Sequence, residues 1–278
     1  MGDPGRIFAD RSEAGGALAQ QVRVAPDEDP VVLALPRGGV PVAVPVAAAL
    51  HAPLDVLAVR KLGAPGQPEL AVGAVAEGRI GVLDQRAAAL TGLTQEHLDA
   101  TLDAEEHELR RRVRAYRGGR PATSIEGRTA ILVDDGLATG LSDLAAVRSA
   151  RAQGATRVIV AAPVSSAEAV TLLREEADDV ITVTVPDAMG SVGRWYRDFA
   201  PVPDEEVVRL LATTRTAAPL HRSVTFPADG GRIDGDLVVP AQARGLVLFA
   251  HGSGSSRLSP RNREVAQALN ARGLATLL

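Results

Sequence analysis

Cysteine is absent from this chain of 278 residues, and histidine is sparse. Without cysteine the chain can form neither a disulfide nor a thiolate site for zinc or an iron–sulfur cluster, which suits a reducing compartment such as the cytoplasm. The histidines are scattered and show no helical ligand spacing: His51, His97, His107, His221 and His251. A metal cage built mainly from protein side chains is therefore not expected.

Aromatic residues and surplus positive charge are also scarce. Phe, Trp and Tyr make up 3% of the chain, and the formal net charge is −4. The one basic cluster consists of arginines at positions 110, 111, 112 and 114, in a stretch that also carries glutamates at positions 105, 106 and 108. This mixture is typical of a solvated helix face. We expect no nucleic-acid partner, because such a partner needs a basic surface or stacking platforms.

No apolar run is long enough to cross a bilayer. The longest, Gly39 to Leu50, contains Pro41 and Pro45. The first 16 residues lack the apolar core of a signal peptide, and Arg6 stands where a myristoylation signal has Ser or Thr. With 46% hydrophobic and 23% charged residues, the chain is expected to be a globular cytoplasmic protein without a membrane partner.

Short runs rich in Val, Ile and Leu alternate with amphipathic stretches from residue 8 to about residue 214. This alternation predicts an α/β domain with a doubly wound, mostly parallel sheet. The expected strands span residues 31–35, 54–59, 130–133, 158–162 and 180–185. The expected helices span residues 9–22, 41–51, 94–117, 141–153, 166–177 and 204–214. A small hairpin over residues 71–84 should turn at residues 78–81.

The pattern changes near residue 215, so we expect two domains, 1–215 and 216–278. SVTFPADGGRIDGDLVVP predicts two strands around a glycine-rich turn, and GLVLFAHGSGSS predicts a buried strand that ends in a glycine loop before a helix. LATLL, at residues 274–278, is typical of a further strand. So few elements bury little core, which suggests an incomplete second domain.

The stretch TAILVDDGLATGLSDLAA, residues 129–146, is the most informative part of the chain. A buried strand ends in Asp134 and Asp135, and a loop of small residues leads into a helix. Free backbone N–H groups and the helix dipole at such a junction bind anions, above all phosphate. A nucleotide-triphosphate loop would have Lys where Leu141 stands.

The two acids point to the rest of the ligand. Carboxylates beside a phosphate suit vicinal hydroxyls and a magnesium ion bound to those oxygens. Phosphate and diol together predict a sugar phosphate. Helix capping is the alternative, although a single Asp directly before the helix would satisfy it.

The segment ILVDDGLATGLS resembles the phosphoribosyl pyrophosphate (PRPP) signature of type I phosphoribosyltransferases, and the resemblance extends over about residues 8–214. It implies a Rossmann-like domain with a hairpin and a C-terminal hood. It also implies Mg²⁺-dependent transfer of the 5-phosphoribosyl group to a nucleobase-like nitrogen acceptor, with release of pyrophosphate. Asp134 and Asp135 would hold the ribose hydroxyls and, through these or water, the Mg²⁺. The 5′-phosphate would bind to Gly136, Leu137, Ala138, Thr139, Gly140 and Ser142.

A second anion site is expected for the pyrophosphate. LPRGG, residues 35–39, places Arg37, Gly38 and Gly39 at a strand end and resembles the family's pyrophosphate loop, although such a sequence alone is equally compatible with a simple turn. Arg60 and Lys61 follow the next expected strand. Lys61 is the single lysine among 30 basic residues, which suggests a site for a compact ammonium, with chance as the alternative.

The resemblance also implies a loop that closes over the site and a set of catalytic residues. The Gly- and Pro-rich segment 63–68 would close over the site, as the family's flexible loop does, and keep water from the reacting ribose. The expected catalytic residues are Asp134, Asp135, Lys61 and Arg37. We expect PRPP and a small nitrogenous acceptor as ligands. The oligomeric state stays open, with a homodimer as one hypothesis.

Ala138 bears on the acceptor. Family members that salvage 6-oxopurines carry an Asp at this place, so hypoxanthine and guanine are disfavoured. The segment VGRWYRDFAPVPDEEV contributes Trp195 and Tyr196. These side chains could stack on a base, as the family's hood does, or pack the C-terminal helix, and the sequence does not decide between the two.

The tail GLVLFAHGSGSSRLSPRNREVAQALNARGLATLL resembles the early part of an α/β-hydrolase domain of the dienelactone hydrolase type. The sequence has no nucleophile elbow Gly-x-Ser-x-Gly, and no ordered Asp and His can follow Ser253 or Ser255. The tail is therefore expected to be inactive in hydrolysis. Two other functions stay open: a PRPP-binding regulator without catalysis, and the transferase half of a fusion with such a hydrolase.

Overall fold

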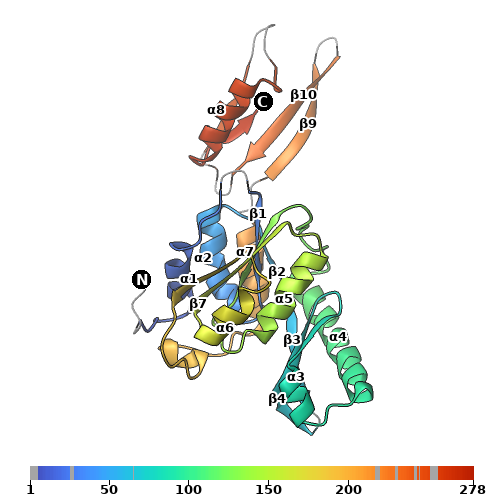
Figure 1. Cartoon of the computed structure of the whole chain (residues 1–278). Helices are drawn as coiled ribbons and strands as arrows, with labels where there is room; N and C mark the ends of the chain where they lie inside the picture. Colours follow the sequence, from blue (N-terminus) through green and yellow to red (C-terminus); the bar gives the residue numbers. More distant parts are fainter. Residues whose placement is uncertain are drawn as a thin grey trace. The chain divides into compact units, whose positions relative to one another are not determined.

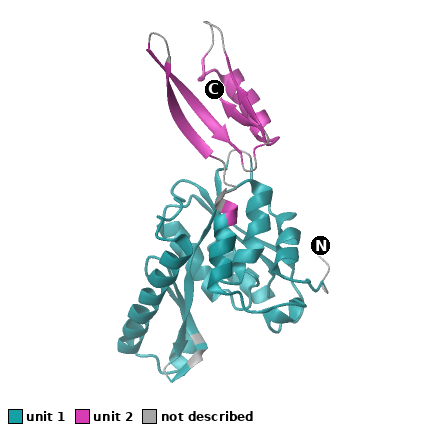
Figure 2. Cartoon of the chain, turned by 180° about the vertical axis from the view of Figure 1, so that it is seen from behind, with its two compact units in different colours: residues 1–212 teal, residues 213–278 magenta. Residues whose placement is uncertain are grey.

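The computed structural model describes residues 6–25, 28–64, 66–216, 220–228, 231–240, 243, 245–250 and 256–278. The chain forms two compact units, Met1–Ala212 and Thr213–Leu278 (Figure 2). The first unit contains a parallel sheet with helices on both faces and a smaller antiparallel sheet. The second contains one four-stranded sheet and, within its described residues, one complete helix.

Five parallel strands form the main sheet of the first unit, in the order β2-β1-β6-β7-β8 (Figure 1). They are β1 Pro30–Ala34, β2 Leu54–Val56, β6 Thr129–Val133, β7 Arg157–Val164 and β8 Asp179–Thr184. The strands β1, β6 and β7 are apolar runs buried on both faces, which is typical of a parallel sheet. The expected parallel sheet is confirmed, and all five strands end at the same edge, where α/β proteins bind ligands.

Helices cover both faces of this sheet. One face packs against α1 Arg11–Ala19, α2 Gly39–Leu50 and α7 Asp204–Thr216, and the other against α5 Leu141–Ala152 and α6 Ala167–Leu173. Alternate residues of β6 serve the two cores: Ile131 and Val133 belong to the first, and Ala130 and Leu132 to the second. The doubly wound arrangement is confirmed, as are the helices expected in these regions.

The antiparallel sheet consists of β3 Val59–Ala64, β4 Gln67–Ala76 and β5 Ile80–Leu83. β4 and β5 form the expected hairpin, whose turn lies at residues 77–79 and not at the expected 78–81. Two other expectations are wrong. The strand expected at 54–59 ends at Val56. A separate strand, β3, begins at Val59 and carries Lys61 in the antiparallel sheet. In the described part of the segment 63–68, residues 63 and 64 belong to β3 and residues 67 and 68 to β4, so these residues form paired strands and not an open loop. Residue 65 lies outside the described residues, and closure over the site stays a prediction.

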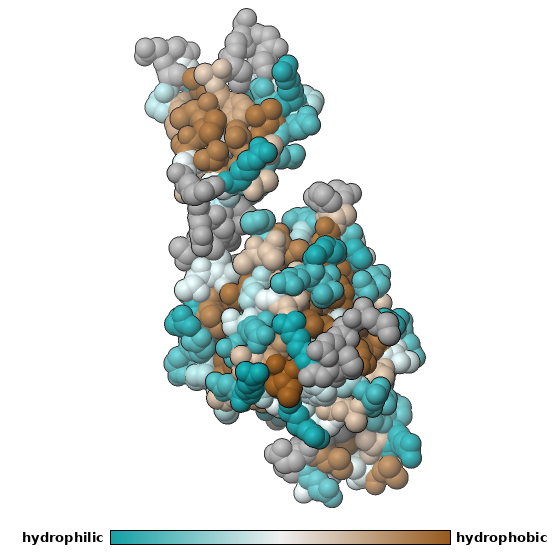
Figure 3. Space-filling model, turned by 90° about the vertical axis from the view of Figure 1, so that its left-hand side faces the viewer, coloured by the Kyte–Doolittle hydropathy of each residue, from teal (hydrophilic) through white to brown (hydrophobic). Residues whose placement is uncertain are grey.

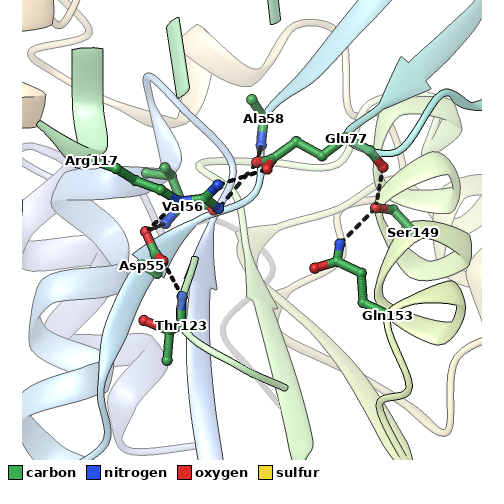
Figure 4. A network of polar contacts seen from close by, with 8 residues as sticks. All are labelled: Asp55, Val56, Ala58, Glu77, Arg117, Thr123, Ser149 and Gln153. Atoms are coloured by element: carbon green, nitrogen blue, oxygen red, sulfur yellow. Dashed lines mark hydrogen bonds and ion pairs between the residues drawn. The ribbon is translucent and has the colours of Figure 1, made fainter. Parts of the chain in front are cut away.

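Two helices accompany the antiparallel sheet. They are α3 Gln85–Leu90, which the sequence did not predict, and α4 Gln95–Arg117, which it did. Arg117, the last residue of α4, joins the two sheets (Figure 4). Its guanidinium donates to Asp55 on β2 at 3.2 Å, to Glu77 after β4 at 2.9 Å and to the Val56 carbonyl at 2.7 Å. This network fixes the antiparallel sheet, and Lys61 with it, to the edge of the main sheet.

The second unit has the strand order β11-β12-β10-β9. Its elements are β9 Leu220–Ala228, β10 Gly231–Val239, β11 Leu246–Leu248, α8 Pro260–Asn270 and β12 Ala275–Leu277. The expected hairpin, helix and last strand are present. The expectation that β11 is a buried strand is wrong, because this strand lies at the edge of the sheet and its Leu246 and Leu248 are 51% and 66% exposed. Figure 3 shows hydrophobic residues gathered on the surface of this unit. Ser253 and Ser255 lie outside the described residues.

Candidate functional site

The acid pair lies at the carboxyl edge of the main sheet, where β6 ends. Asp134 and Asp135 follow Val133, and the Asp135 N–H donates to Asp134 Oδ1 at 2.8 Å. The chain then leads into α5, whose N-cap residue Gly140 has a φ of +77°, a left-handed conformation that favours glycine. The amino end of α5 therefore follows a short loop of small residues, which is the local geometry of an anion site.

The junction between β7 and α6 fixes the shape of this loop. The Leu137 N–H donates to the Val164 carbonyl, and the Ser166 N–H donates to the Leu137 carbonyl, each at 2.9 Å. The Ser166 hydroxyl donates to the Ala138 carbonyl at 2.8 Å and accepts from the Ala169 N–H at 2.9 Å. Sequence reasoning missed Ser166, because its only signal was a position at the start of an expected helix.

The glycine loop after β1 packs directly against the acids. A β-carbon on Gly38 would overlap the Asp135 carboxylate, and one on Gly39 would overlap the Val133 carbonyl. Larger residues therefore do not fit at either position without a shift of the neighbouring chain. The structure thus brings together the two motifs that the sequence singled out.

A cleft of about 730 Å³ opens beside the acids. Four of the expected site residues line it: Arg60, Lys61, Asp134 and Ser142. The helix α4 forms another wall, with His97, Thr101, Glu105 and Arg112. Arg60 is bound to this wall, since its Nε lies 2.6 Å from Glu105 Oε2. Sequence reasoning took this part of α4 for a solvated surface and missed its place beside the site.

Other expected site residues lie away from this cleft. Arg37 Nη1 lies 3.6 Å from Asp204 Oδ1, at the start of α7. Thr139 lines a second hollow, of about 740 Å³, together with residues of β5 and α5. Leu137 is fully buried, and Gly136 packs against the Val192 side chain. The motif is continuous in sequence, but its members face different sides of the loop.

Two distant parts of the chain hold Asp135. Arg11, the first residue of α1, donates from Nε to Asp135 Oδ2 at 2.9 Å, and the Tyr196 hydroxyl donates to the Asp135 carbonyl at 2.6 Å. Tyr196 is only 5% exposed and contacts the rings of Phe8 and Phe199. Its ring packs the protein and has no free face on which a base could stack.

Three carboxylates and one lysine share this site. Burial raises the pKa of Asp134 well above its ordinary value, and the charges of Asp135 and Asp143 raise it further. Burial also raises the pKa of Asp135, against the effect of Arg11. For Asp143, in the first turn of α5, burial and the Asp135 charge raise the pKa to about 7. Lys61 lowers the pKa of all three acids and acts as a shared counter-charge.

No group of three or more His, Asp or Glu side chains in the described parts of the chain is placed to hold a metal ion by itself. The acid pair nevertheless offers hard oxygen atoms of the kind that suit Mg²⁺ when a ligand supplies the remaining coordination. None of the helices that the structure describes is long and apolar enough to cross a membrane.

Comparison with known proteins identifies the family. The model of the phosphoribosyl transferase domain matches residues 9–196, a span that includes the acid pair, the loop into α5 and the glycine loop after β1. The chain belongs to this family. The resemblance that ILVDDGLATGLS carries is therefore confirmed for the first unit, whereas the hydrolase-like character of the second unit stays a prediction.

The relatives carry the same family name. Two Mycobacterium tuberculosis proteins, MT0597 of strain CDC 1551 / Oshkosh and Rv0571c of strain ATCC 25618 / H37Rv, are provisionally named phosphoribosyl transferases. Each is 43% identical over 286 residues, which cover 98% of this chain and 65% of the relative. The chain thus spans less than two thirds of the length of these curated relatives. The crystal structure of TT1426 from Thermus thermophilus is 45% identical, with 74% of this chain and 97% of that one covered and a TM-score of 0.63.

Proposed function

We propose that this phosphoribosyl transferase moves the 5-phosphoribosyl group of PRPP to a nucleobase-like nitrogen acceptor, with Mg²⁺ required and pyrophosphate released. One observation carries the proposal: the glycine loop after β1 packs on the acid pair, and the acid pair begins the loop into α5. Two anion sites therefore flank one pair of carboxylates. PRPP has the matching order of groups, with its ribose diol between a phosphate and a pyrophosphate.

The 5′-phosphate would bind at the amino end of α5. Backbone N–H groups of residues 136–140 would face it together with the helix dipole, except that of Leu137, which donates to the Val164 carbonyl. The Ser142 hydroxyl would add a donor from the cleft. The contacts of Ser166 with Leu137 and Ala138 support this assignment, because they hold the loop in one conformation before a ligand arrives.

The ribose hydroxyls would donate to Asp134 and Asp135. Burial and the neighbouring acids raise the pKa of Asp134, and a positive charge bound nearby would lower it again and favour the ionised carboxylate. Both acids would contact Mg²⁺ indirectly, through ribose oxygens or water. When bound to PRPP, the ion would supply positive charge to the departing pyrophosphate.

In the transfer, the bond between ribose C1 and the pyrophosphate oxygen breaks, and its electron pair leaves with the pyrophosphate. The lone pair of the acceptor nitrogen forms the new bond to C1. Positive charge builds on the ribose, so the chain contributes by holding the leaving group and orienting the ring. Lys61 and Arg60 in the cleft, with the backbone at Gly38, would hold pyrophosphate. The Gly39 N–H already donates to the Leu35 carbonyl at 3.0 Å, so Gly39 would contribute by its close packing and not as a donor. Arg37 would join them by leaving Asp204.

The acceptor is expected to be other than hypoxanthine or guanine, because Ala138 offers no carboxylate to exchange a proton with the base. A proton carried by the acceptor nitrogen would pass to solvent. Trp195 is partly exposed, and its indole N–H donates to the Met189 carbonyl at 2.9 Å. We propose Trp195 as the aromatic residue of the hood that contacts the acceptor, and the low exposure of Tyr196, 5%, supports this choice.

Two alternatives compete with this proposal. A regulator that binds PRPP without catalysis would need the loop into α5 but would not need Lys61 in the cleft, so the position of Lys61 favours transfer. The transferase half of a fusion with a dienelactone-type hydrolase is supported by the separate second unit and by the greater length of the curated relatives.

A product screen tests the proposal. The protein is incubated with PRPP, Mg²⁺ and single nucleobases or small amines, and the phosphoribosylated product is identified by mass spectrometry. We expect product with one acceptor class, none with hypoxanthine or guanine, and none in the variant Asp134→Asn/Asp135→Asn. Asp179→Asn is the matched control, because Asp179 also accepts from the N–H of the next residue at 2.8 Å but lies at the start of β8, away from the site. Product formation that survives in the double variant would contradict the proposal.

A further inference from the structure

We propose that Arg11 is a positioning residue of the donor site, which fixes the Asp135 carboxylate for the ribose of PRPP. This inference rests on the proposed function. The two residues are 124 positions apart, yet Arg11 Nε lies 2.9 Å from Asp135 Oδ2, and their side chains are only 11% and 15% exposed. A charge-assisted hydrogen bond is stronger than a neutral one, and solvent and salt screen these two largely buried charges less than they screen the ion pairs of a protein surface.

The position of Arg11 in its helix supports a role beyond folding. Arg11 is the first residue of α1, whose N-cap is Asp10. The amino end of a helix carries partial positive charge, so a cation there opposes the helix dipole. A residue that is unfavourable for its own helix is typical of a functional site, because its contacts in the site offset the unfavourable interaction with the helix dipole.

The guanidinium is itself held in place by three contacts. Besides Asp135, its Nη1 donates to the Ala200 carbonyl at 2.9 Å, and its central carbon lies 3.9 Å from the centre of the Phe199 ring. A planar group with several donors can bind a carboxylate and a carbonyl while it stacks on a ring, which an ammonium cannot do. Arg11 therefore presents a fixed donor to the carboxylate.

Asp135 in turn stands between the two anion sites. Its Oδ2 carries the contact from Arg11 and lies against Gly38 of the glycine loop, and its backbone carbonyl accepts from Tyr196. The remaining oxygen, Oδ1, is the one that a ribose hydroxyl would meet. Without Arg11, the Asp135 carboxylate would lose the guanidinium contact that holds its Oδ2 in place beside Asp134.

A purely structural role for Arg11 would be to tie α1 to the segment around Tyr196. Backbone contacts already do this, because the Phe8 N–H donates to the Trp195 carbonyl and the Arg197 N–H donates to the Phe8 carbonyl, each at 2.8 Å. The side chain of Arg11 adds a link to Asp135 that this backbone pairing does not supply.

The test compares Arg11→Met and Arg11→Lys with a matched control on the same segment. The control is Arg6→Met, because Arg6 also pairs with an acid, Glu13 at 3.3 Å, and also lies over an aromatic ring, Phe8 at 5.1 Å, but it does not touch the acid pair. Titration calorimetry measures the Kd for PRPP with Mg²⁺, and pyrophosphate release measures kcat and KM.

We expect Arg11→Met to raise the Kd and the KM for PRPP by about tenfold or more, with a smaller change in kcat. Arg11→Lys should recover part of this loss, and Arg6→Met should match the wild type. In the variant Arg11→Met/Asp135→Asn the loss should be no greater than in Asp135→Asn alone, because both changes remove the same contact. An unchanged Kd in Arg11→Met, or losses that multiply in the double variant, would overturn the inference. Wild-type protein that neither binds PRPP nor releases pyrophosphate would overturn the proposed function as well.

Discussion

The buried carboxylate of Asp143 should lower the stability of the protein as the pH rises. Its side chain is 4% exposed, and among the described residues its Oδ1 is the one buried side-chain oxygen or nitrogen atom without a hydrogen-bond partner. Burial and the charge of Asp135 raise its pKa from 3.8 to about 7. Because the raised value belongs to the folded state, ionisation of Asp143 destabilises the fold.

The sign of the pH dependence follows from these two values. Below about pH 4 the carboxyl group is protonated in both states and has no such effect. The penalty grows as the pH rises from 3.8 and is complete above about 7, where the difference in pKa corresponds to about 4 kcal/mol of unfolding free energy. Asp143→Asn removes the charge and keeps the shape, but it leaves a buried polar group that costs about 1–3 kcal/mol.

We therefore expect Asp143→Asn to be more stable than the wild type by about 1–3 kcal/mol at pH 8 and to lose this advantage near pH 4. Urea unfolding at a series of pH values measures the difference, with Asp179→Asn as a control at an exposed position. A variant that is less stable than the wild type at pH 8, or a difference that does not change with pH, would refute the reasoning. Loss of pyrophosphate release in a stabilised variant would show that the site uses this costly carboxylate.

Three further predictions follow from the packing of the site. Gly38→Ala should abolish pyrophosphate release while the protein stays folded by circular dichroism, because a β-carbon would overlap the Asp135 carboxylate; full activity would contradict the packing of the two motifs. Ser166→Ala should raise the KM for PRPP several-fold in steady-state assays, because it removes the contact with the Ala138 carbonyl. Thr171→Ala removes a hydroxyl bound to the backbone of the same helix and should leave the KM unchanged. Equal effects of the two variants would mean that the change acts through the stability of α6 and not through the loop. Arg117→Met should lower the unfolding free energy by about 3–5 kcal/mol in urea titrations, since buried acids lose their partner, and a loss below about 1 kcal/mol would count against the network.

Much of the fold could be predicted because its signals are local. The buried strands read as apolar runs, and the helices between them show regular periodicity, so β1, β6 and β7 and their neighbours were placed within a few residues. The helix α3 was missed because its six residues, QRAAAL, are too few to show a period. The Gly and Pro content of the segment 63–68 predicts a loop, but Ala64 pairs with Gln67 because β3 and β4 continue into this segment, which composition does not show.

The site residues also differ in whether the local sequence could reveal them. Asp134, Asp135 and the loop into α5 form one continuous motif, and the neighbouring glycines of the β1 loop follow from the meeting of strand ends at one edge. Arg11 and Ser166 act across long stretches of sequence, so neither carries a local signal of its contact with the motif. Whether Tyr196 packs the protein or stacks on a base depends on the burial of its ring, which the sequence does not show.

Pyrophosphate release from PRPP and Mg²⁺, measured with and without the acceptor found in the product screen, tests the central claim most directly. We predict release that depends on the acceptor, equals the amount of product and disappears in Asp134→Asn/Asp135→Asn but not in Asp179→Asn. Wild-type protein that binds PRPP and releases no pyrophosphate with any acceptor would contradict the proposed transfer and favour a regulator.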